Sequence, residues 1–383
     1  MLQSNYHLLW AAFLIILSGG IFGTKFFTFI DKDIKETRMQ NIDGLRYLLA
    51  SFVALHHFIV GRNYTITGQW KVPDNIFDTF AGQFGVIIFF MISGSLFVTL
   101  CDQKTDWVKF YIRRFFRLVP MLFLSSALCI AIAILLQVKS GNFIYNDNYI
   151  NWFDAAMLNQ RPDLFGFIHS FTISGGVTWT LYWEWMLYFS LPVLFIMNIK
   201  KESFSLMIAI LFVCYYIYSK YDYSTSLFIS SFAFGGLMRT ISNTLVFKKT
   251  LSLNIFTLIA FAASIIFGCY NTPYTFTALI VYALFFLMIC LGGNFFGLLT
   301  SAGFRRLGDA SFSIYLLHPI AWFVMNKLLL HFNLFDKVIW VIVASTISWL
   351  FICYVSIISF HYIETYFISL GKKSTDKIKS PTL

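Results

Sequence analysis

The chain has 383 residues, of which 58% are apolar and only 12% are charged, and its formal net charge is +10. Soluble domains carry about 25% charged residues, so this composition excludes an ordinary soluble protein. We expect an all-α, polytopic integral membrane protein. The basic excess does not by itself indicate nucleic-acid binding, because its distribution along the chain indicates membrane topology instead.

Apolar runs divide the chain into about ten core membrane helices, preceded by one extra N-terminal hydrophobic helix. The N-terminal run has no basic residues before it and no clear cleavage site after it, which favours a retained helix over a signal sequence. Eleven spans place the two termini on opposite sides of the membrane. The predicted spans are 7–23, 45–61, 84–101, 118–138, 180–198, 204–219, 226–240, 252–270, 275–291, 310–330 and 338–360.

Basic residues fall unevenly between the two sets of loops. One set contains 21 of the 28 lysines and arginines, and the positive-inside rule makes that set cytoplasmic. The polar C-terminal tail belongs to it, so we predict a cytoplasmic C-terminus. The longest loop on the opposite side, 139–177, is rich in Asn, Asp and aromatic residues. It either lines a site for a polar substrate or is a packed surface loop.

Six cysteines lie inside or at the edge of apolar runs, and none forms a CxxC pair. We expect buried free thiols and no disulfide framework. No group of Asp, Glu, His and Cys has the spacing of metal ligands, so we expect no metal.

The stretch from Asp43 to His57 is an apolar helix that carries two ionisable residues on one face. Arg46 and His57 are eleven positions apart, which is about three turns and ~16 Å along a helix. His56 points about 100° away from that face. An ionisable group at membrane depth is a candidate for function. A neutral histidine is a general base near pH 7, and the alternative is a purely structural hydrogen bond.

A second cluster lies in the sequence YIRRFFRLVP, where Arg113, Arg114 and Arg117 are neighbours on one helix. Like charges this close repel unless an anion lies between them, and guanidinium groups bind phosphate well. The alternative is a positive-inside anchor that touches lipid phosphates.

Other polar positions interrupt the later spans. Glu184 lies among the rings of TWTLYWEWMLYF, where it can pair with His57 or with another donor. Gly94, between two serines, permits close helix approach, and a serine nucleophile is the weaker alternative. His318 lies three residues after Tyr315 and is a further candidate. For Glu364, a structural ion pair is more plausible than chemistry.

Six of these segments, in this order, resemble the membrane-bound acyltransferase-3 family, the integral-membrane O-acyltransferases of bacterial surface polysaccharides. The resemblance covers 41–367 and corresponds to the single-domain form of the family. Residues 1–40 are then an extra hydrophobic segment with its connector, and residues 368–383 are a cytoplasmic polar tail. The six segments are IDGLRYLLASFVALHH, GVIIFFMISGSL, YIRRFFRLVP, TWTLYWEWMLYF, LGDASFSIYLLHP and YIETYF.

The resemblance implies which residues carry the chemistry. The family pattern of a basic residue, ten residues and a histidine falls on Arg46 and His57, and the family's Trp-x-Leu-x-x-Glu motif ends at Glu184. These three are the expected catalytic residues. The family's arginine motif falls on the triplet that would bind the donor coenzyme: Arg113, Arg114 and Arg117.

The implied reaction moves an acyl group, usually acetyl, from cytoplasmic acyl-CoA to a hydroxyl of a surface glycan such as a lipopolysaccharide O-chain. The expected location is the bacterial inner membrane. The expected partners are acyl-CoA, a glycan or lipid-linked glycan and membrane lipid, with no permanently bound cofactor and no nucleic acid. His57 acts either as general base or as carrier of the acyl group, and Glu184 orients it. A glycan or lipid transporter and a structural membrane protein are the alternatives from other functional classes.

Overall fold

The structure is a computed structural model that describes residues 6–31, 39–72, 76–158, 160–198, 202–221, 224–245, 250–272 and 274–378. Within these ranges it is all-α: the sole extended feature is an isolated bridge between Leu164 and Phe167. The long helices are α1 (Tyr6–Phe22), α2 (Gln40–Thr67), α3 (Ile76–Phe97), α4 (Trp107–Ser140), α6 (Trp179–Met197), α7 (Ser203–Tyr221), α8 (Ser224–Thr244), α9 (Thr250–Tyr270), α10 (Phe276–Cys290), α12 (Ser311–His331) and α13 (Val338–Ser359).

The predicted all-α, polytopic fold is confirmed, and each of the eleven predicted spans coincides with one of these helices. Eight helices in the described part of the chain are long and apolar enough to cross a membrane, and α1 and α10 contain shorter apolar segments. The short elements are η1 (Lys25–Ile30), η2 (Val98–Cys101), η3 (Asp147–Phe153), α5 (Phe171–Ser174), α11 (Ala302–Asp309), a π-helical turn (Phe360–Glu364) and α14 (Thr365–Asp376).

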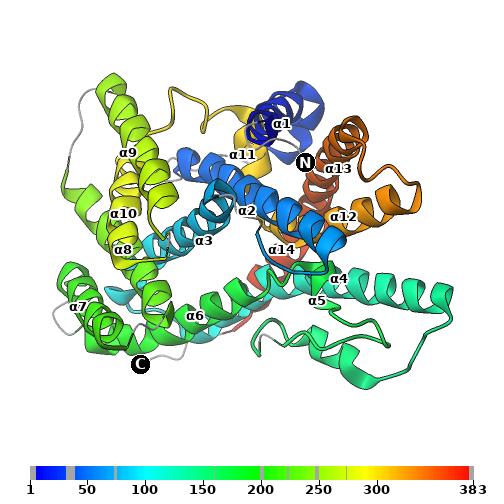
Figure 1. The fold of residues 1–383 in the computed structure, drawn as a ribbon. Helices are drawn as coiled ribbons and strands as arrows, with labels where there is room; N and C mark the ends of the chain where they lie inside the picture. The colour runs from blue at the N-terminus through cyan, green and yellow to red at the C-terminus, as the bar shows by residue number, and fades with distance from the viewer. Residues whose placement is uncertain are drawn as a thin grey trace.

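The helices form an inner group and an outer group. In α2, α3 and α12, 67% of the residues in the most apolar 18-residue stretch of the helix are buried inside the protein. The corresponding share is 22% in α7 and 28% in α6 and α9. The outer helices therefore expose large apolar side chains, such as Phe212 and Ile259, as lipid contact requires. Helices α7 to α10 form one side of the bundle, and α1, α12 and α13 lie on the other, with α2 and α3 between them (Figure 1).

Glycines let the inner helices approach one another closely. A Cβ atom on Gly94 of α3 would lie 2.0 Å from the carbonyl oxygen of Phe232 on α8, and one on Gly235 of α8 would lie 2.0 Å from the carbonyl oxygen of Met91 on α3. Any side chain at either position would force the two backbones apart. The close approach expected around Gly94 is therefore present, and α8 is its partner.

The N-terminal segment packs into the bundle. Trp349 on α13 donates a 3.2 Å hydrogen bond to the Ser18 hydroxyl, which lies 2.5 Å from the Tyr47 hydroxyl of α2. Arg306 on α11 makes a bidentate ion pair with Asp31, at 2.7 and 2.8 Å. The described part of 1–40 thus forms hydrogen bonds or an ion pair with α2, α11 and α13. The domain boundaries at 40 and 367 stay a prediction.

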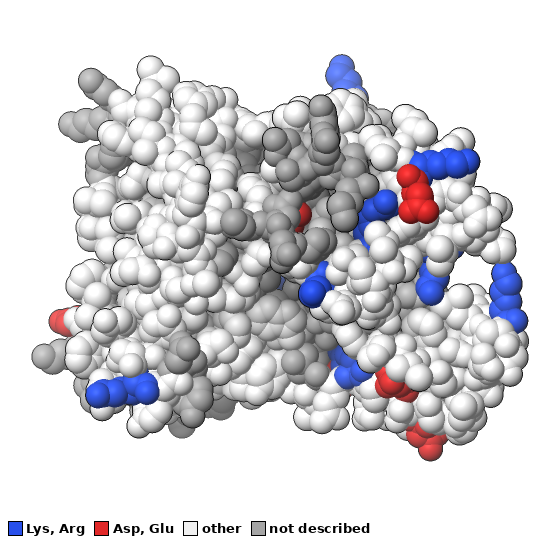
Figure 2. Space-filling model, in the orientation of Figure 1, with Lys and Arg blue, Asp and Glu red and all other residues white. Residues whose placement is uncertain are grey.

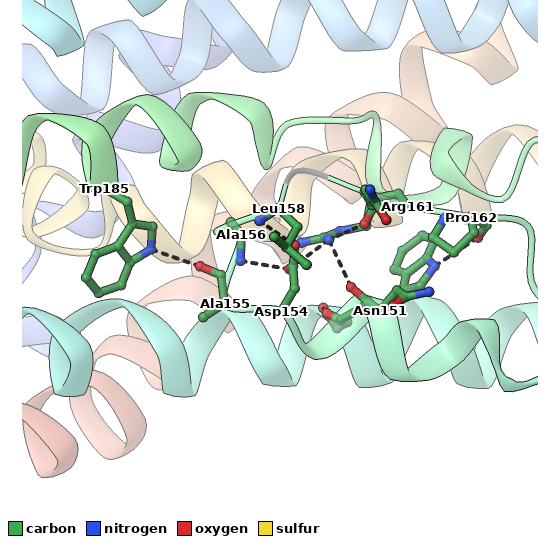
Figure 3. Close-up of polar contacts among 11 residues, drawn as sticks. Asn151, Asp154, Ala155, Ala156, Leu158, Arg161, Pro162 and Trp185 are labelled. Carbon is green, nitrogen blue, oxygen red and sulfur yellow. Dashed lines mark hydrogen bonds and ion pairs between the residues drawn. The ribbon is translucent and has the colours of Figure 1, made fainter. Parts of the chain in front are cut away.

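The long loop after α4 is a packed structure, as Figure 3 shows. Arg161 and Asp154 form a buried 2.9 Å ion pair, and the Asp154 carboxylate also accepts hydrogen bonds from the backbone N–H groups of Ala156 and Leu158. Trp185 of α6 donates to the carbonyl oxygen of Ala155 at 2.9 Å. The loop is therefore anchored to the membrane helix that carries Glu184, and one of its residues, Thr172, also lines a cavity. The packing is thus present, and the alternative that the loop lines a site for a polar substrate stays a prediction.

Much of the face in Figure 2 is uncharged, and most of its Lys, Arg, Asp and Glu side chains gather on the right of the view. All six cysteines are free and five of them are buried, as predicted. The assignment of sides rests partly on residues outside the described ranges, so the cytoplasmic C-terminus stays a prediction. The basic residues concerned are Lys32, Lys35, Arg38, Lys200, Lys201, Lys248, Lys249 and Lys379.

Candidate active site

His57 of α2 is paired with His318 of α12. The Nε2 atom of His318 lies 3.0 Å from Nδ1 of His57, which is also 3.1 Å from the carbonyl oxygen of Val53. Nδ1 of His318 lies 3.0 Å from the carbonyl oxygen of Ile314. Because a carbonyl oxygen only accepts, both Nδ1 atoms carry the hydrogen in the neutral rings. His318 Nε2 is then an acceptor for the His57 N–H, and His57 keeps a basic lone pair on Nε2.

Gly175 closes the other side of the His57 ring. It has a φ of +63°, and a Cβ atom there would lie 3.3 Å from Cδ2 of His57 and 2.9 Å from Cβ of Pro319. The position thus requires glycine both for its backbone conformation and for space. His318, Gly175 and Pro319 therefore surround the imidazole ring.

The neighbouring His56 points elsewhere, as the helical geometry predicts. Its Nδ1 atom lies 2.9 Å from the carbonyl oxygen of Asp78 on α3, and its ring packs against Gly82. His57, by contrast, lines a cavity of about 230 Å³ between α2 and α12, which we call the outer cavity. The outer cavity is lined by His57, Gly61, Tyr64, Thr65, Gly68, Trp70, Thr172, Pro319, Trp322, Phe323, Asn326, Lys327 and Leu330.

A second cavity, of about 120 Å³, contains most of the predicted charged residues, and we call it the arginine pocket. Arg46, Arg114, Arg117 and Glu184 all line it, although they come from three different helices. Arg46 is one of the first residues of α2 and His57 is eleven positions further along the same unbroken helix, so α2 connects the two cavities over ~16 Å.

Aromatic rings hold Arg114 in the arginine pocket. Its guanidinium carbon lies 5.3 Å from the ring centre of Phe97 and 5.5 Å from that of Phe110, which is within cation–π distance. Its Nε atom is buried without a hydrogen-bond partner among the described residues. The ring contacts fix the guanidinium in place while leaving donor capacity for an anion.

Glu184 lies in the arginine pocket and not beside His57. Its Oε1 atom accepts a hydrogen bond from the hydroxyl of Tyr188, one turn further along α6. Nδ1 of His57 contacts His318 and the backbone carbonyl of Val53, so the structure does not bring the predicted His57–Glu184 pair together. Within the described residues, His318 occupies the position that the sequence assigned to Glu184.

Arg113 also differs from its predicted place. It does not line the arginine pocket; it donates to the Thr375 hydroxyl at 3.0 Å and lies 3.6 Å from the Asp376 carboxylate. Both partners belong to α14, which packs along α4. The sequence could not separate Arg113 from Arg114 and Arg117, because the helix that engages it follows 250 residues later.

Tyr315 lies between the two cavities. It lines the arginine pocket, and its ring centre is 6.0 Å from that of His318. Its hydroxyl donates to the carbonyl oxygen of Val177 at 3.0 Å and lies 2.8 Å from the Thr180 hydroxyl. The series Tyr315, His318, His57 therefore leads from the arginine pocket to the outer cavity. The spacing in YLLH places Tyr315 and His318 on one face, but only tertiary packing brings them to His57.

Glu364, the last residue of the π-helical turn, is 1% exposed and accepts a 2.5 Å hydrogen bond from the Ser313 hydroxyl. This partner is a neutral hydroxyl, so the structural ion pair expected for Glu364 stays a prediction. Among the described residues, no three His, Cys, Asp or Glu side chains lie close enough to hold a metal ion.

A comparison with protein families identifies the family of the chain. The acyltransferase-3 family model, described as an acyltransferase domain, matches residues 39–358, which is most of the chain. No match was found among curated proteins or among solved structures. The matched region contains both cavities and the histidine pair, so the transporter and structural alternatives are set aside. The chain belongs to the acyltransferase-3 family of membrane acyltransferases.

Proposed function

We propose that this protein is an integral-membrane O-acyltransferase of the bacterial inner membrane. It moves an acyl group, most simply acetyl, from cytoplasmic acyl-CoA to a hydroxyl of a cell-surface glycan such as the lipopolysaccharide O-antigen. The observation that carries the proposal is the position of the His57–His318 pair between a cationic pocket and a polar cavity whose described lining has one lysine and is otherwise uncharged.

The arginine pocket suits the donor. Three guanidinium groups, with Arg114 held by rings, match the phosphates of coenzyme A. The count of basic residues in the loops favours this end of α2 as the cytoplasmic end. Arg46 and His57 are ~16 Å apart along α2. The pantetheine arm of coenzyme A is long and flexible, so the phosphates can bind in the arginine pocket while the thioester reaches His57.

His57 Nε2 suits the chemistry on the acceptor. As a general base it takes the proton of the acceptor hydroxyl while the oxygen attacks the thioester carbonyl; the C–S bond breaks, and the thiolate of coenzyme A leaves and is protonated. His318 contacts the ring at Nδ1, and the backbone carbonyl of Val53, at the same nitrogen, stabilises the imidazolium that forms. As a carrier, the same nitrogen would hold the acyl group between two transfer steps.

The test is complementation of a strain that lacks the gene, using wild type, His57→Ala and the control His56→Asn. His56→Asn keeps a donor for the carbonyl oxygen of Asp78. We expect wild type and the control to restore O-acyl groups on the surface glycan, measured by mass spectrometry and NMR. His57→Ala should lower acylation about a hundredfold or more while reaching the membrane in equal amount.

Full acylation by membrane-inserted His57→Ala would refute the proposal. A second measurement separates the two roles of His57: purified protein is mixed with radiolabelled acetyl-CoA in the absence of acceptor and quenched. Label retained on the wild-type protein and absent from His57→Ala indicates an acyl-histidine, and an unlabelled protein that still transfers indicates a general base.

A further inference from the structure

Asn326 of α12 has a buried side-chain amide without a hydrogen-bond partner among the described residues. It is 2% exposed, and neither its Oδ1 nor its Nδ2 atom has a hydrogen-bond partner among the residues that the structure describes. It lines the outer cavity together with His57. Leaving a buried donor and a buried acceptor unsatisfied is costly, so the partner must enter through the cavity.

The chemistry of Asn326 restricts what that partner is. An amide presents a donor and an acceptor without charge, and a group that both donates and accepts, such as a pair of hydroxyls, satisfies both. The described lining of the outer cavity contains no carboxylate, and its one cation, Lys327, is exposed and lies over the ring of Phe323 at 5.5 Å. A neutral, hydroxyl-rich ligand therefore fits this wall of the cavity better than an ion.

The amide lies one helical turn from the reacting histidine. Gly61 follows His57 by four residues on the same face of α2, about 6 Å along the axis. A Cβ atom on Gly61 would lie 3.6 Å from Nδ2 of Asn326. A group bound to Asn326 is therefore adjacent to a group that reacts at His57.

An aromatic wall completes this part of the cavity. The ring centre of Trp70 lies 6.5 Å from that of His57 and 5.8 Å from that of Tyr64. The Asn63 amide donates to the carbonyl oxygens of Gln69 and Lys71, which holds the segment that carries Trp70. A tryptophan ring offers a flat apolar face, which complements the C–H face of a sugar ring.

We propose that Asn326 is a specificity-determining residue of the acceptor site, where it binds two neighbouring hydroxyls of a pyranose next to the hydroxyl that is acylated, with Trp70 as the wall behind the ring. This inference rests on the proposed function, because it takes the outer cavity as the acceptor site. It names the feature of the acceptor that the protein recognises: a vicinal diol beside the acylated position.

The experiment uses purified full-length protein in detergent, acetyl-CoA as donor and, as acceptor, glycan extracted from a strain that lacks the gene. Asn326→Leu keeps the side-chain volume and removes both hydrogen-bonding atoms. Gly61→Ala places a methyl group against the amide at an ordinary contact distance. The control, Asn271→Leu, makes the same change at an exposed asparagine at the end of α9.

We expect Asn326→Leu to raise the KM for glycan about tenfold and Gly61→Ala to raise it in the same direction, because one or two hydrogen bonds to the acceptor are lost. The KM for acetyl-CoA and the release of coenzyme A without acceptor should stay at the wild-type values, and the control should match wild type throughout.

Each other outcome overturns a different statement. If wild type transfers acetyl groups and Asn326→Leu has an unchanged glycan KM, Asn326 holds only water and the inference fails while the proposed function stands. If Asn326→Leu does not fold, Gly61→Ala decides in the same way. If wild type transfers no acetyl group to the glycan, the proposed function fails and the inference falls with it.

Discussion

The arginine pocket and the outer cavity lie along the same helix, α2, but they differ in charge. The arginine pocket has three arginines and one glutamate in its wall, whereas the described wall of the outer cavity has one exposed lysine and is otherwise neutral. We infer that each cavity serves a different substrate: an anionic donor in the first and a neutral, polar acceptor in the second.

The difference also explains how charged residues are tolerated in an apolar bundle. Each charge at the centre of a membrane helix costs ~2.5–3.5 kcal/mol on insertion scales, so unused charges at that depth are disfavoured. The arginines lie at the start of α2 and in the first turns of α4, and the deeper part of α2 carries histidines, which are neutral near pH 7. His318 of α12 is fully buried as well.

The largest expected effect concerns His318, which lies between Tyr315 of the arginine pocket and His57 of the outer cavity. His318→Ala removes the side chain that contacts Nδ1 of His57 and leaves the Val53 carbonyl to orient the ring, so we expect kcat to fall about a hundredfold while both KM values stay within about threefold. The pH profile of kcat should also shift, because the environment of the His57 ring changes. The measurement is steady-state transfer with each substrate varied in turn.

His331→Ala is the matched control, since His331 is exposed at the end of the same helix. It should resemble wild type. An unchanged kcat in His318→Ala would mean that the histidine contact is only structural, and that His318 does not couple the arginine pocket to His57.

The next effect separates the two cavities by substrate. Arg114→Gln or Arg117→Gln should raise the KM for acyl-CoA about tenfold and leave the KM for glycan unchanged, because a charge-assisted contact to phosphate is lost in the arginine pocket alone. Arg113→Gln should change either value by less than about threefold, because Arg113 is engaged by α14.

Equal effects of all three substitutions would contradict the assignment of Arg113 to a structural role. An increase in the glycan KM for Arg114→Gln would instead show that the arginine pocket contributes to acceptor binding, and the comparison between the cavities would not hold.

Local patterns were sufficient to predict the helices and much of the arginine pocket. The apolar runs gave all eleven long helices because burial in lipid or in the bundle demands continuous hydrophobicity. Helical geometry alone selected His57 over His56, since the two side chains point about 100° apart. The positions of Arg114 and Arg117 also follow from their spacing on one face of α4.

The remaining features depend on contacts between distant segments. Glu184 accepts a hydrogen bond from Tyr188, and His318 lies beside His57 in place of Glu184. Whether Glu184 or His318 lies beside His57 depends on how α6 and α12 pack against α2, and helical periodicity does not predict that packing. Asn326 is a single amide in an apolar run, and its importance appears only because Gly61, on another helix, leaves room beside it. Arg113 is separated from its neighbours only by α14.

The smallest expected effect concerns a region that reaches neither cavity, the N-terminal segment. The Arg306 guanidinium holds the pKa of the Asp31 carboxyl below its ordinary value of 3.8. A carboxyl whose pKa is lower in the folded protein contributes stability that is complete above its unfolded pKa and is lost as the pH falls through the folded pKa. We therefore expect the Arg306–Asp31 pair to contribute fully at pH 7 and to lose its contribution below about pH 3.8.

The side chain of Asp31 is 47% exposed, so solvent screens the pair and its contribution should not exceed about 1 kcal/mol. Asp31→Asn should lower the thermal midpoint of the purified protein slightly at pH 7, and the difference from wild type should shrink only below the unfolded pKa, as the pH falls through the folded pKa of Asp31. Both KM values should equal those of wild type, because Arg306 and Asp31 lie outside both cavities. A changed KM for acyl-CoA would mean that the N-terminal segment acts on the arginine pocket through α2, and the two cavities would then not be the only parts of the protein that set substrate affinity.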